Sequence, residues 1–224
     1  MINDKRIRII TGHYGSGKTE FSVNYAVKLA SMGKKVALAD LDVVNLYFRS
    51  RERAETLKEL GIKVIGSSIN TPAVDVPAIS PEVATPLQDE SYEAILDVGG
   101  DPAGARALGR YVEYFKEGNY DMFFVLNANR PETQSAVKAI EYIRKIEDVS
   151  RTKVTGIINN THLLKSTTVE DVLKGQELAL EVSNKINIPI KYISTLESVA
   201  ENLPNNLEGE IFPIKLFMRE EWML

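Results

Sequence analysis

The segment with the clearest chemistry lies near the start of the chain, where eight residues follow the phosphate-binding pattern G-x-x-x-x-G-K-[ST]. Glycines let backbone N–H groups turn toward phosphate oxygens, and the N-terminus of a following helix adds the positive end of its dipole. By this pattern Lys18 reaches the β- and γ-phosphates of a nucleoside triphosphate, and the Thr19 hydroxyl binds Mg²⁺. The nucleotide-binding residues expected on this turn are Gly12, His13, Gly15, Ser16, Gly17, Lys18, Thr19 and Glu20.

The residues around this turn predict the strand and the helix that such a site requires. Residues 6–11 are a β-branched run that favours a strand, and residues 20–32 favour a helix that ends before Gly33. This strand–turn–helix context separates a phosphate loop from a chance match to the motif. The alternative is a glycine-rich turn that joins a strand to a helix without binding phosphate.

Two further predicted strands end in aspartates. Residues 35–39 lead into Asp40 and Asp42, and a later strand leads into Asp97. The carboxyl ends of parallel strands form the edge at which α/β proteins bind ligands, and side chains two residues apart on a strand point the same way. We therefore expect these carboxylates to face the phosphates, with Asp42 and Asp97 joining Thr19 as metal ligands. Solvated turns at the strand ends are the alternative.

The segment after the second aspartate strand resembles the other half of a phosphate site. Two glycines, Gly99 and Gly100, are followed by Asp101. A backbone N–H of either glycine could sense the γ-phosphate, and Asp101 could orient a water molecule or relay a movement. An ordinary glycine turn after a strand is the alternative.

Polar residues further along the chain are candidates for contacts with the phosphates and with the base of a nucleotide. A helix predicted over residues 102–115 carries Arg106 and Arg110, which are either arginine fingers or surface arginines. Asn159 and Asn160 follow a later strand. An amide both donates and accepts hydrogen bonds, as the edge of a nucleobase requires, although polar turn residues fit the same positions.

Composition limits the class of protein. A chain of 224 residues predicts one domain over 1–224, and a net charge of −4 gives no strong signal for nucleic-acid binding. The absence of cysteine excludes disulfides and thiolate metal sites. No apolar run approaches the length of a signal region or membrane span, so we expect a cytoplasmic protein.

Two segments fall outside this regular pattern. Residues 66–91 hold four of the nine prolines and predict an extended excursion that faces a partner or substrate, or that simply packs. Within it, Ser80-Pro81 is typical of a helix start. Residues 211–224 are apolar, and we expect them to dock on the core or on a second subunit rather than on a membrane, because Glu220 and Glu221 offset the basic residues.

Together these motifs resemble the MinD/ParA and nitrogenase-iron-protein group of P-loop ATPases, in the SIMIBI class and the CobQ/CobB/MinD/ParA group. The resemblance spans residues 6–195 and implies an α/β three-layer fold with a mainly parallel sheet of about seven strands flanked by helices. It also implies ATP, Mg²⁺ and a nucleotide-dependent homodimer. By that pattern Asp42, with Asp40 beside it, polarises the attacking water, and Asn160 reads adenine.

Two departures from this group are visible. The group's loop carries a second lysine directly after its first glycine, and this chain has His13 there. A neutral histidine does not supply the fixed charge of a lysine. The cysteine pair that would bridge a cluster in the iron-protein branch is also missing, which excludes that redox role.

The sequence therefore predicts a slow, magnesium-dependent ATPase that acts as a switch, with catalytic residues Lys18, Asp40, Asp42 and Asp101, and with an unidentified protein partner. Two other functions fit the same residues. One is an ATP-dependent phosphotransferase or ligase of the dethiobiotin-synthetase type, in which residues 66–91 would build an acceptor pocket. The other is a nucleotide-gated binding module with negligible hydrolysis.

Overall fold

The structure is a computed structural model that describes residues 3–42, 53–66 and 80–218. Half of the proline-rich segment (67–79) and the last six residues of the apolar tail lie outside the described residues. Eight strands form one sheet: β1 Ile7–Thr11, β2 Val36–Asp40, β3 Ile62–Ile65, β4 Glu93–Asp97, β5 Tyr120–Leu126, β6 Gly156–Asn159, β7 Ile190–Leu196 and β8 Glu210–Ile214. The helices are α1 Lys18–Ser31, α2 Ala54–Glu59, α3 Ala84–Gln88, α4 Pro102–Ala105, α5 Ala136–Ser150, α6 Val169–Ile186 and α7 Glu197–Ala200, with 3₁₀ segments Pro81–Val83 and Arg106–Tyr114.

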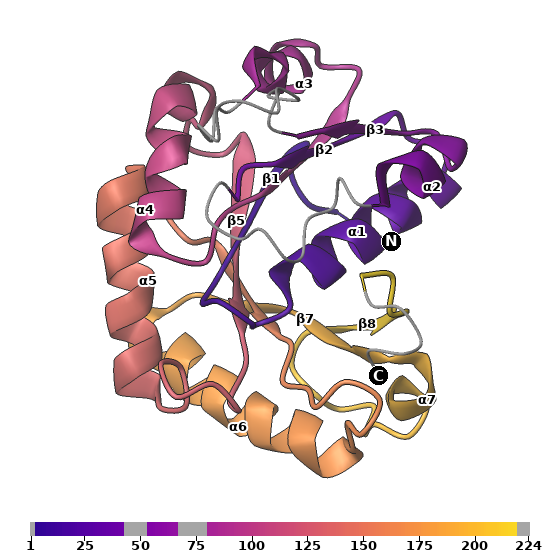
Figure 1. The fold of residues 1–224 in the computed structure, drawn as a ribbon. Coiled ribbons are helices and arrows are strands. Elements are labelled where there is room, and N and C mark those ends of the chain that lie inside the picture. The colour runs from indigo at the N-terminus through magenta and orange to yellow at the C-terminus, as the bar shows by residue number, and fades with distance from the viewer. Residues whose placement is uncertain (1–2, 43–52, 67–79, 219–224) are drawn as a thin grey trace, which may run out of the picture.

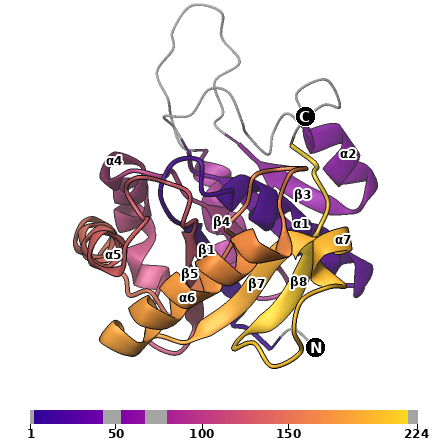
Figure 2. The ribbon, with the colours of Figure 1, turned by 90° about the horizontal axis from the view of Figure 1, so that it is seen from below.

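Every pair of neighbouring strands runs parallel, in the order β3-β2-β4-β1-β5-β6-β7-β8. The phosphate-loop strand β1 therefore lies between β4 and β5, and all the carboxyl ends meet at one edge. Helices α4, α5 and α6 cover one face of the sheet, and α1 and α2 cover the other (Figure 1, Figure 2). Along β1, Ile9 packs into the first layer and Ile10 into the second, and both are fully buried. The predicted three-layer α/β fold is confirmed.

The sheet has one strand more than the predicted number of about seven, because an eighth strand, β8, pairs with β7. Its sequence contains Pro213, which usually argues against a strand because proline lacks the N–H of a sheet ladder. A strand at the outer edge of a sheet has a hydrogen-bonded neighbour on one side only, so proline is tolerated there. The described part of the apolar tail, residues 211–218, thus docks on the core, as expected, and residues 211–214 of it belong to the sheet.

Two predicted helices begin or continue differently from expectation. The helix expected over 102–115 is one α-helical turn that changes to a 3₁₀ segment at Arg106. Glycines at 104 and 109 disfavour a continuous α-helix here. Pro131 is typical of a first helical turn and predicts a helix start there, but α5 begins at Ala136, because residues 127–133 form two consecutive hydrogen-bonded turns. The predicted start at Ser80-Pro81 is confirmed, since Ser80 Oγ accepts a hydrogen bond from the Glu82 N–H.

Candidate functional site

The phosphate loop connects β1 to α1 in a conformation that requires glycine at two positions. Gly12 has φ 145°, and a Cβ there would lie 2.5 Å from the carbonyl oxygen of Val125. Gly17 has φ 89°, and a Cβ there would lie 2.2 Å from Nδ2 of Asn160. Close packing against β5 and against the loop after β6 therefore explains these glycines. Helix α1 begins directly after this turn, at Lys18.

Lys18 lies beneath the loop and is 6% exposed. Its Nζ donates a hydrogen bond to the carbonyl oxygen of His13 at 3.3 Å. Burial lowers the pKa of Lys18, while the nearby carboxylates of Asp97, Asp42 and Asp101 act in the opposite direction. The predicted catalytic lysine and the three aspartates are thus close enough to interact.

The aspartates after β2 and β4 lie side by side, as the strand-end argument predicted. Asp40 and Asp97 are paired in the register of the two strands. The N–H of Asp42 donates to Oδ1 of Asp40 at 3.0 Å, which turns the chain so that Asp42 lines the cavity. A Cβ on Gly99 would lie 3.2 Å from Oδ1 of Asp42, so the loop after β4 packs against this carboxylate.

Asp97 is the most deeply buried of these carboxylates, at 1% exposure. Burial raises its pKa to about 6, although Lys18 and the Thr19 hydroxyl favour the ionised form. Ser22 Oγ donates to Oδ1 of Asp97 at 3.2 Å, and Oδ2 has no hydrogen-bond partner in the described part of the chain. A buried carboxylate oxygen without a partner is costly unless another group binds it.

These residues fit a magnesium ion that is shared with a nucleotide. Within residues 3–42, 53–66 and 80–218 no three His, Cys, Asp or Glu side chains form a complete metal cluster. Mg²⁺ is usually bound by one or two protein oxygens together with phosphates and water, so a complete cluster is not required. The free oxygen of Asp97, with Thr19 and Asp42 nearby, matches that donor set.

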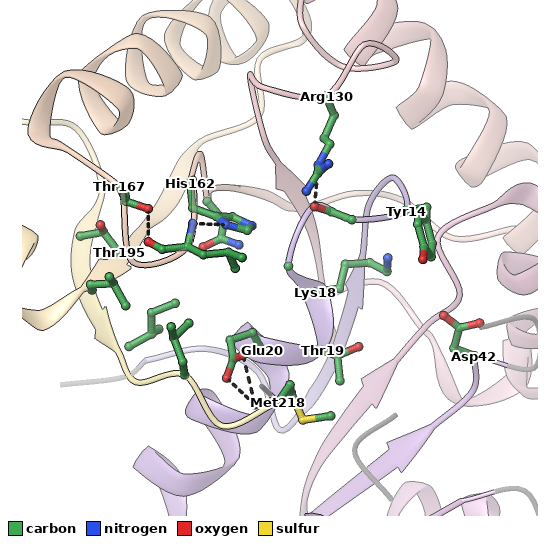
Figure 3. A pocket seen from close by; sticks show the side chains of 17 residues that line it. Tyr14, Lys18, Thr19, Glu20, Asp42, Arg130, His162, Thr167, Thr195 and Met218 are labelled. Carbon is green, nitrogen blue, oxygen red and sulfur yellow. Dashed lines mark hydrogen bonds between the residues drawn. The ribbon is translucent and has the colours of Figure 1, made fainter. Parts of the chain in front are cut away.

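A cavity of about 260 Å³ opens beside the loop (Figure 3). Lys18, Thr19 and Asp42 lie on one side of it, and His162, Thr167 and Thr195 lie on the other. Its lining combines charged or polar side chains with an apolar group made by Leu164, Leu196, Ile214, Leu216 and Met218. Such a cavity suits a ligand with an anionic end and a flat apolar end.

Asn160 is another residue that lines this cavity. Its Nδ2 donates to the carbonyl oxygen of Ser16 at 2.7 Å, which fixes the orientation of the amide. Its Oδ1 has no hydrogen-bond donor among the described residues, and the hydroxyl of Thr195, another lining residue, has no partner among them either. The Oδ1 of Asn160 is therefore an acceptor that remains open to a ligand.

Asn159 has a different environment from its neighbour. Its Nδ2 donates to the carbonyl oxygen of Val172 and to Oε1 of Gln176, and its Oδ1 accepts from the Thr161 N–H. These bonds connect the end of β6 to α6. The predicted nucleotide contact of Asn159 stays a prediction.

Close packing in this region explains a glycine in the middle of α6. A Cβ on Gly175 would lie 2.1 Å from Oγ1 of Thr161 and 2.3 Å from Oδ1 of Asn159. We expect Gly175→Ala to lower the free energy of unfolding by roughly 1–3 kcal/mol, because both neighbours are held by hydrogen bonds and overpacking exceeds the helix preference of alanine. Urea unfolding measures this. Gly109→Ala, where a Cβ would meet no atom within 4 Å, is the matched control, and an unchanged midpoint for Gly175→Ala would contradict the packing argument.

The loop Gly99–Asp101 rests on the phosphate loop. A Cβ on Gly100 would lie 2.7 Å from Nζ of Lys18 and 2.7 Å from the Tyr14 nitrogen. The Tyr142 hydroxyl, on α5, donates to the Gly100 carbonyl oxygen. Asp101 caps α4, since its Oδ1 accepts from the Gly104 N–H at 2.5 Å. Its predicted catalytic role stays a prediction, and its observed contact is with α4.

The His13 side chain contacts residues of its own chain. Its Nδ1 lies 2.8 Å from the Tyr14 carbonyl oxygen, its Nε2 lies 3.6 Å from a carboxylate oxygen of Glu132, and its ring packs edge-on against Tyr142 with 5.2 Å between centroids. His13 is not among the residues that line the cavity. The imidazole thus connects the phosphate loop to the segment after β5 and to α5.

Glu20, predicted to bind the nucleotide, holds the chain after β8. Its carboxylate accepts hydrogen bonds from the N–H groups of Phe217, at 2.5 Å, and of Met218, at 3.2 Å. Asn24, one turn further along α1, binds both the N–H and the carbonyl oxygen of Lys215. The first turns of α1 thereby place the apolar residues 214–218 against the cavity. Glu20 also lines the cavity, so a direct nucleotide contact stays a prediction.

Comparisons with known proteins agree with this geometry. Residues 7–173, more than half of the chain, match the family described as the CobQ/CobB/MinD/ParA nucleotide binding domain. This chain belongs to that family. The family membership confirms the resemblance to MinD/ParA-like P-loop proteins and identifies a nucleotide-binding protein. The sequences of curated proteins give no significant match.

Solved structures with the same fold come from several organisms. FtsY from Thermotoga maritima is 23% identical with a TM-score of 0.55, over 85% of this chain and 62% of that one. Chloroplast FtsY from Physcomitrella patens is 19% identical with a TM-score of 0.56, over 86% and 59%. A nucleotide-binding protein from Archaeoglobus fulgidus, in complex with ADP, is 18% identical with a TM-score of 0.51, over 88% and 85%. At these identities the similarity shows the fold alone, and this chain spans about three fifths of the FtsY chains.

Sequence reasoning missed much of the apolar and loop-derived lining. The residues it did not single out are Tyr14, Arg130, His162, Leu164, Thr167, Thr195, Leu196, Ile214, Leu216 and Met218. The signal that could have found several of them is the strand-end rule, because Arg130, His162 and Thr195 lie at or just beyond the carboxyl ends of β5, β6 and β7. In the described ranges no helix is long and apolar enough to cross a membrane.

Proposed function

We propose that this protein is a magnesium-dependent ATPase that acts as a nucleotide-controlled switch. The observation that carries the proposal is the convergence of Lys18, Asp42 and Asp97 at the carboxyl edge of the sheet, beside one cavity that is partly lined by apolar side chains. Buried cationic and carboxylate groups of this kind match phosphoryl transfer, in which positioning and charge neutralisation supply most of the catalysis.

Each residue has a defined part in the proposed reaction. Lys18 donates hydrogen bonds to the β- and γ-phosphates, and Asp42 orients a water molecule in line with the γ-phosphorus and accepts its proton. The bond from the water oxygen to phosphorus forms while the bond to the bridging oxygen breaks, and ADP leaves with that electron pair. Thr19 and Asp97 would hold Mg²⁺, which neutralises charge on the phosphate oxygens when it is bound.

The packing of Gly100 on Lys18 supports a switch. A γ-phosphate at Lys18 needs room beside Gly100, so its arrival or loss would move this loop. The carbonyl oxygen of Gly100 accepts a hydrogen bond from Tyr142 on α5. Gly99 packs against α4, because a Cβ on Gly104 would lie 2.7 Å from the Gly99 Cα. The proposed switch therefore acts on α4 and α5, and we propose that an unidentified protein partner responds to these helices.

The acceptor at Asn160 supports adenine over guanine. Adenine carries an amino group where guanine carries an acceptor oxygen, so Oδ1 of Asn160 would bind the first and repel the second. We expect Asn160→Ala to lower Mg-ATP affinity about tenfold more than Mg-GTP affinity, the cost of leaving one hydrogen bond unmade. Titration of both nucleotides measures this. Since the bond from Asn160 to Ser16 braces the loop for either nucleotide, an equal loss of both affinities would contradict base reading.

A nucleotide-dependent homodimer is part of the same proposal. Tyr14, in the phosphate loop, is 54% exposed, and Leu163, after β6, is also exposed. Both side chains are available for contact with a second copy of this chain, and Tyr14 lines the cavity. The solution mass with Mg-ATP and with Mg-ADP tests this, and the same mass in both states would contradict it.

Phosphate release tests the central proposal. We expect the rate of phosphate release from Mg-ATP to be higher than the rate from Mg-GTP. We expect no phosphate release when a chelator removes the metal, and none from the Asp42→Asn variant. Tight ATP binding without any release would contradict hydrolysis and favour the nucleotide-gated binding module. ADP production that requires an added acceptor would favour a phosphotransferase or ligase.

A further inference from the structure

Arg130 is an unexpected neighbour of the phosphate loop. It lies in the turn after β5, and its side chain reaches over the loop, where Nε donates to the Gly15 carbonyl oxygen at 2.8 Å (Figure 3). A Cβ on Gly15 would lie 3.1 Å from the guanidinium carbon, so the two groups are in direct contact. The two turns that contain Asn127 and Thr133 fix the segment that carries Arg130.

The charged side chains around the cavity indicate a role for Arg130 in binding an anionic ligand. Among the described residues that line the cavity, Lys18 and Arg130 are the cationic side chains, and Glu20 and Asp42 are the carboxylates. A nucleoside triphosphate brings several negative charges that Lys18 alone does not balance. The terminal nitrogens of Arg130 have no hydrogen-bond acceptor in the described ranges, so the planar fork remains able to bind phosphate oxygens.

His13, in the phosphate loop, is not placed to bind the phosphates. His13 faces the Tyr14 carbonyl and Glu132 and does not line the cavity. We propose that Arg130 binds the phosphate chain of the nucleotide in its own subunit and supplies the second fixed positive charge of the site. This inference rests on the proposed nucleotide binding, and it adds a binding residue that acts in cis.

The test must separate phosphate binding from mere bracing of the loop, since Arg130 also holds Gly15. We compare Arg130→Ala and Arg130→Lys with the matched control Arg144→Ala, which removes an exposed arginine from α5. Calorimetric titration with Mg-ATP measures affinity, and thermal unfolding without nucleotide measures bracing. We expect Arg130→Ala to bind about tenfold or more weakly, Arg130→Lys to regain part of the loss because it keeps the charge, and Arg144→Ala to match the parent.

Three results would overturn the inference. The first is unchanged affinity in Arg130→Ala. The second is equal weakening in Arg130→Lys and Arg130→Ala together with an equal fall in the ligand-free melting temperature, which is the signature of bracing alone. A parent protein that fails to bind Mg-ATP would overturn the proposed function, and this inference with it, so the two failures are distinguishable.

Mixing two impaired variants tests whether Arg130 acts within its own subunit. A mixed dimer of Arg130→Ala and Lys18→Ala chains has one intact Arg130 and one intact Lys18, but the two residues are in different chains. We expect phosphate release from the mixture to stay at the level of the separate variants. Recovery of release on mixing would place the arginine across a dimer and overturn the cis assignment.

Discussion

Replacement of Lys18 by alanine is expected to lower the affinity for Mg-ATP at least about a hundredfold and to abolish phosphate release. The ammonium group is buried beneath the loop, close to Asp97, Asp42 and Asp101, and burial lowers its pKa. Phosphate oxygens would favour its charged form, and each charge-assisted hydrogen bond in such a site contributes about 1.5–3 kcal/mol. Two such bonds correspond to the expected loss.

The control for this variant lies on the same helix. Lys28 is an exposed lysine in the last turn of α1, so Lys28→Ala removes the same charge at a distance from the cavity. We expect it to bind Mg-ATP like the parent. Thermal unfolding of Lys18→Ala without nucleotide must accompany the titration, because the change leaves Asp97 without its nearby cation. A folded Lys18→Ala protein that binds Mg-ATP as tightly as the parent would refute the phosphate-site assignment.

The phosphate end of the site was predictable because its signals are local. A β-branched strand, a glycine turn and a helix stand next to one another in the sequence. Asp40 and Asp97 each end a strand, and Asp42 lies two residues beyond the first of them. The rule that parallel strands share one carboxyl edge then brings these segments together without any knowledge of the strand order. The confirmed pairing of Asp40 with Asp97 is a consequence of that rule.

The apolar end was not predictable, because the contacts that build it are long-range. Pro213 argued against a strand, and only pairing with β7 makes residues 210–214 one. Glu20 looked like part of the phosphate loop, but its carboxylate holds Phe217 and Met218, almost two hundred residues away. Arg130 was part of an apparent helix start, and the hydrogen-bonded turns that aim it at Gly15 have no distinctive pattern in the sequence.

The second large effect concerns the pH dependence of magnesium binding through Asp97. Burial raises the pKa of this carboxyl to about 6, and the protonated form is a poor ligand for Mg²⁺. The affinity for Mg-ADP should therefore be constant above about pH 7 and fall by up to about tenfold per pH unit below about pH 6. Titrations of Mg²⁺ into the ADP complex between pH 5 and 8 measure this profile.

The profile needs a variant without the carboxylate, because the terminal phosphate of ADP also titrates near pH 6. Asp97→Asn keeps the shape of the side chain and removes its proton equilibrium, so the part of the inflection that disappears in this variant belongs to Asp97. We also expect Asp97→Asn to lose most of the magnesium dependence of nucleotide binding at pH 8. An identical pH profile in both proteins would show that Asp97 does not hold the metal. In that case the unpartnered oxygen of this buried carboxylate would need another explanation.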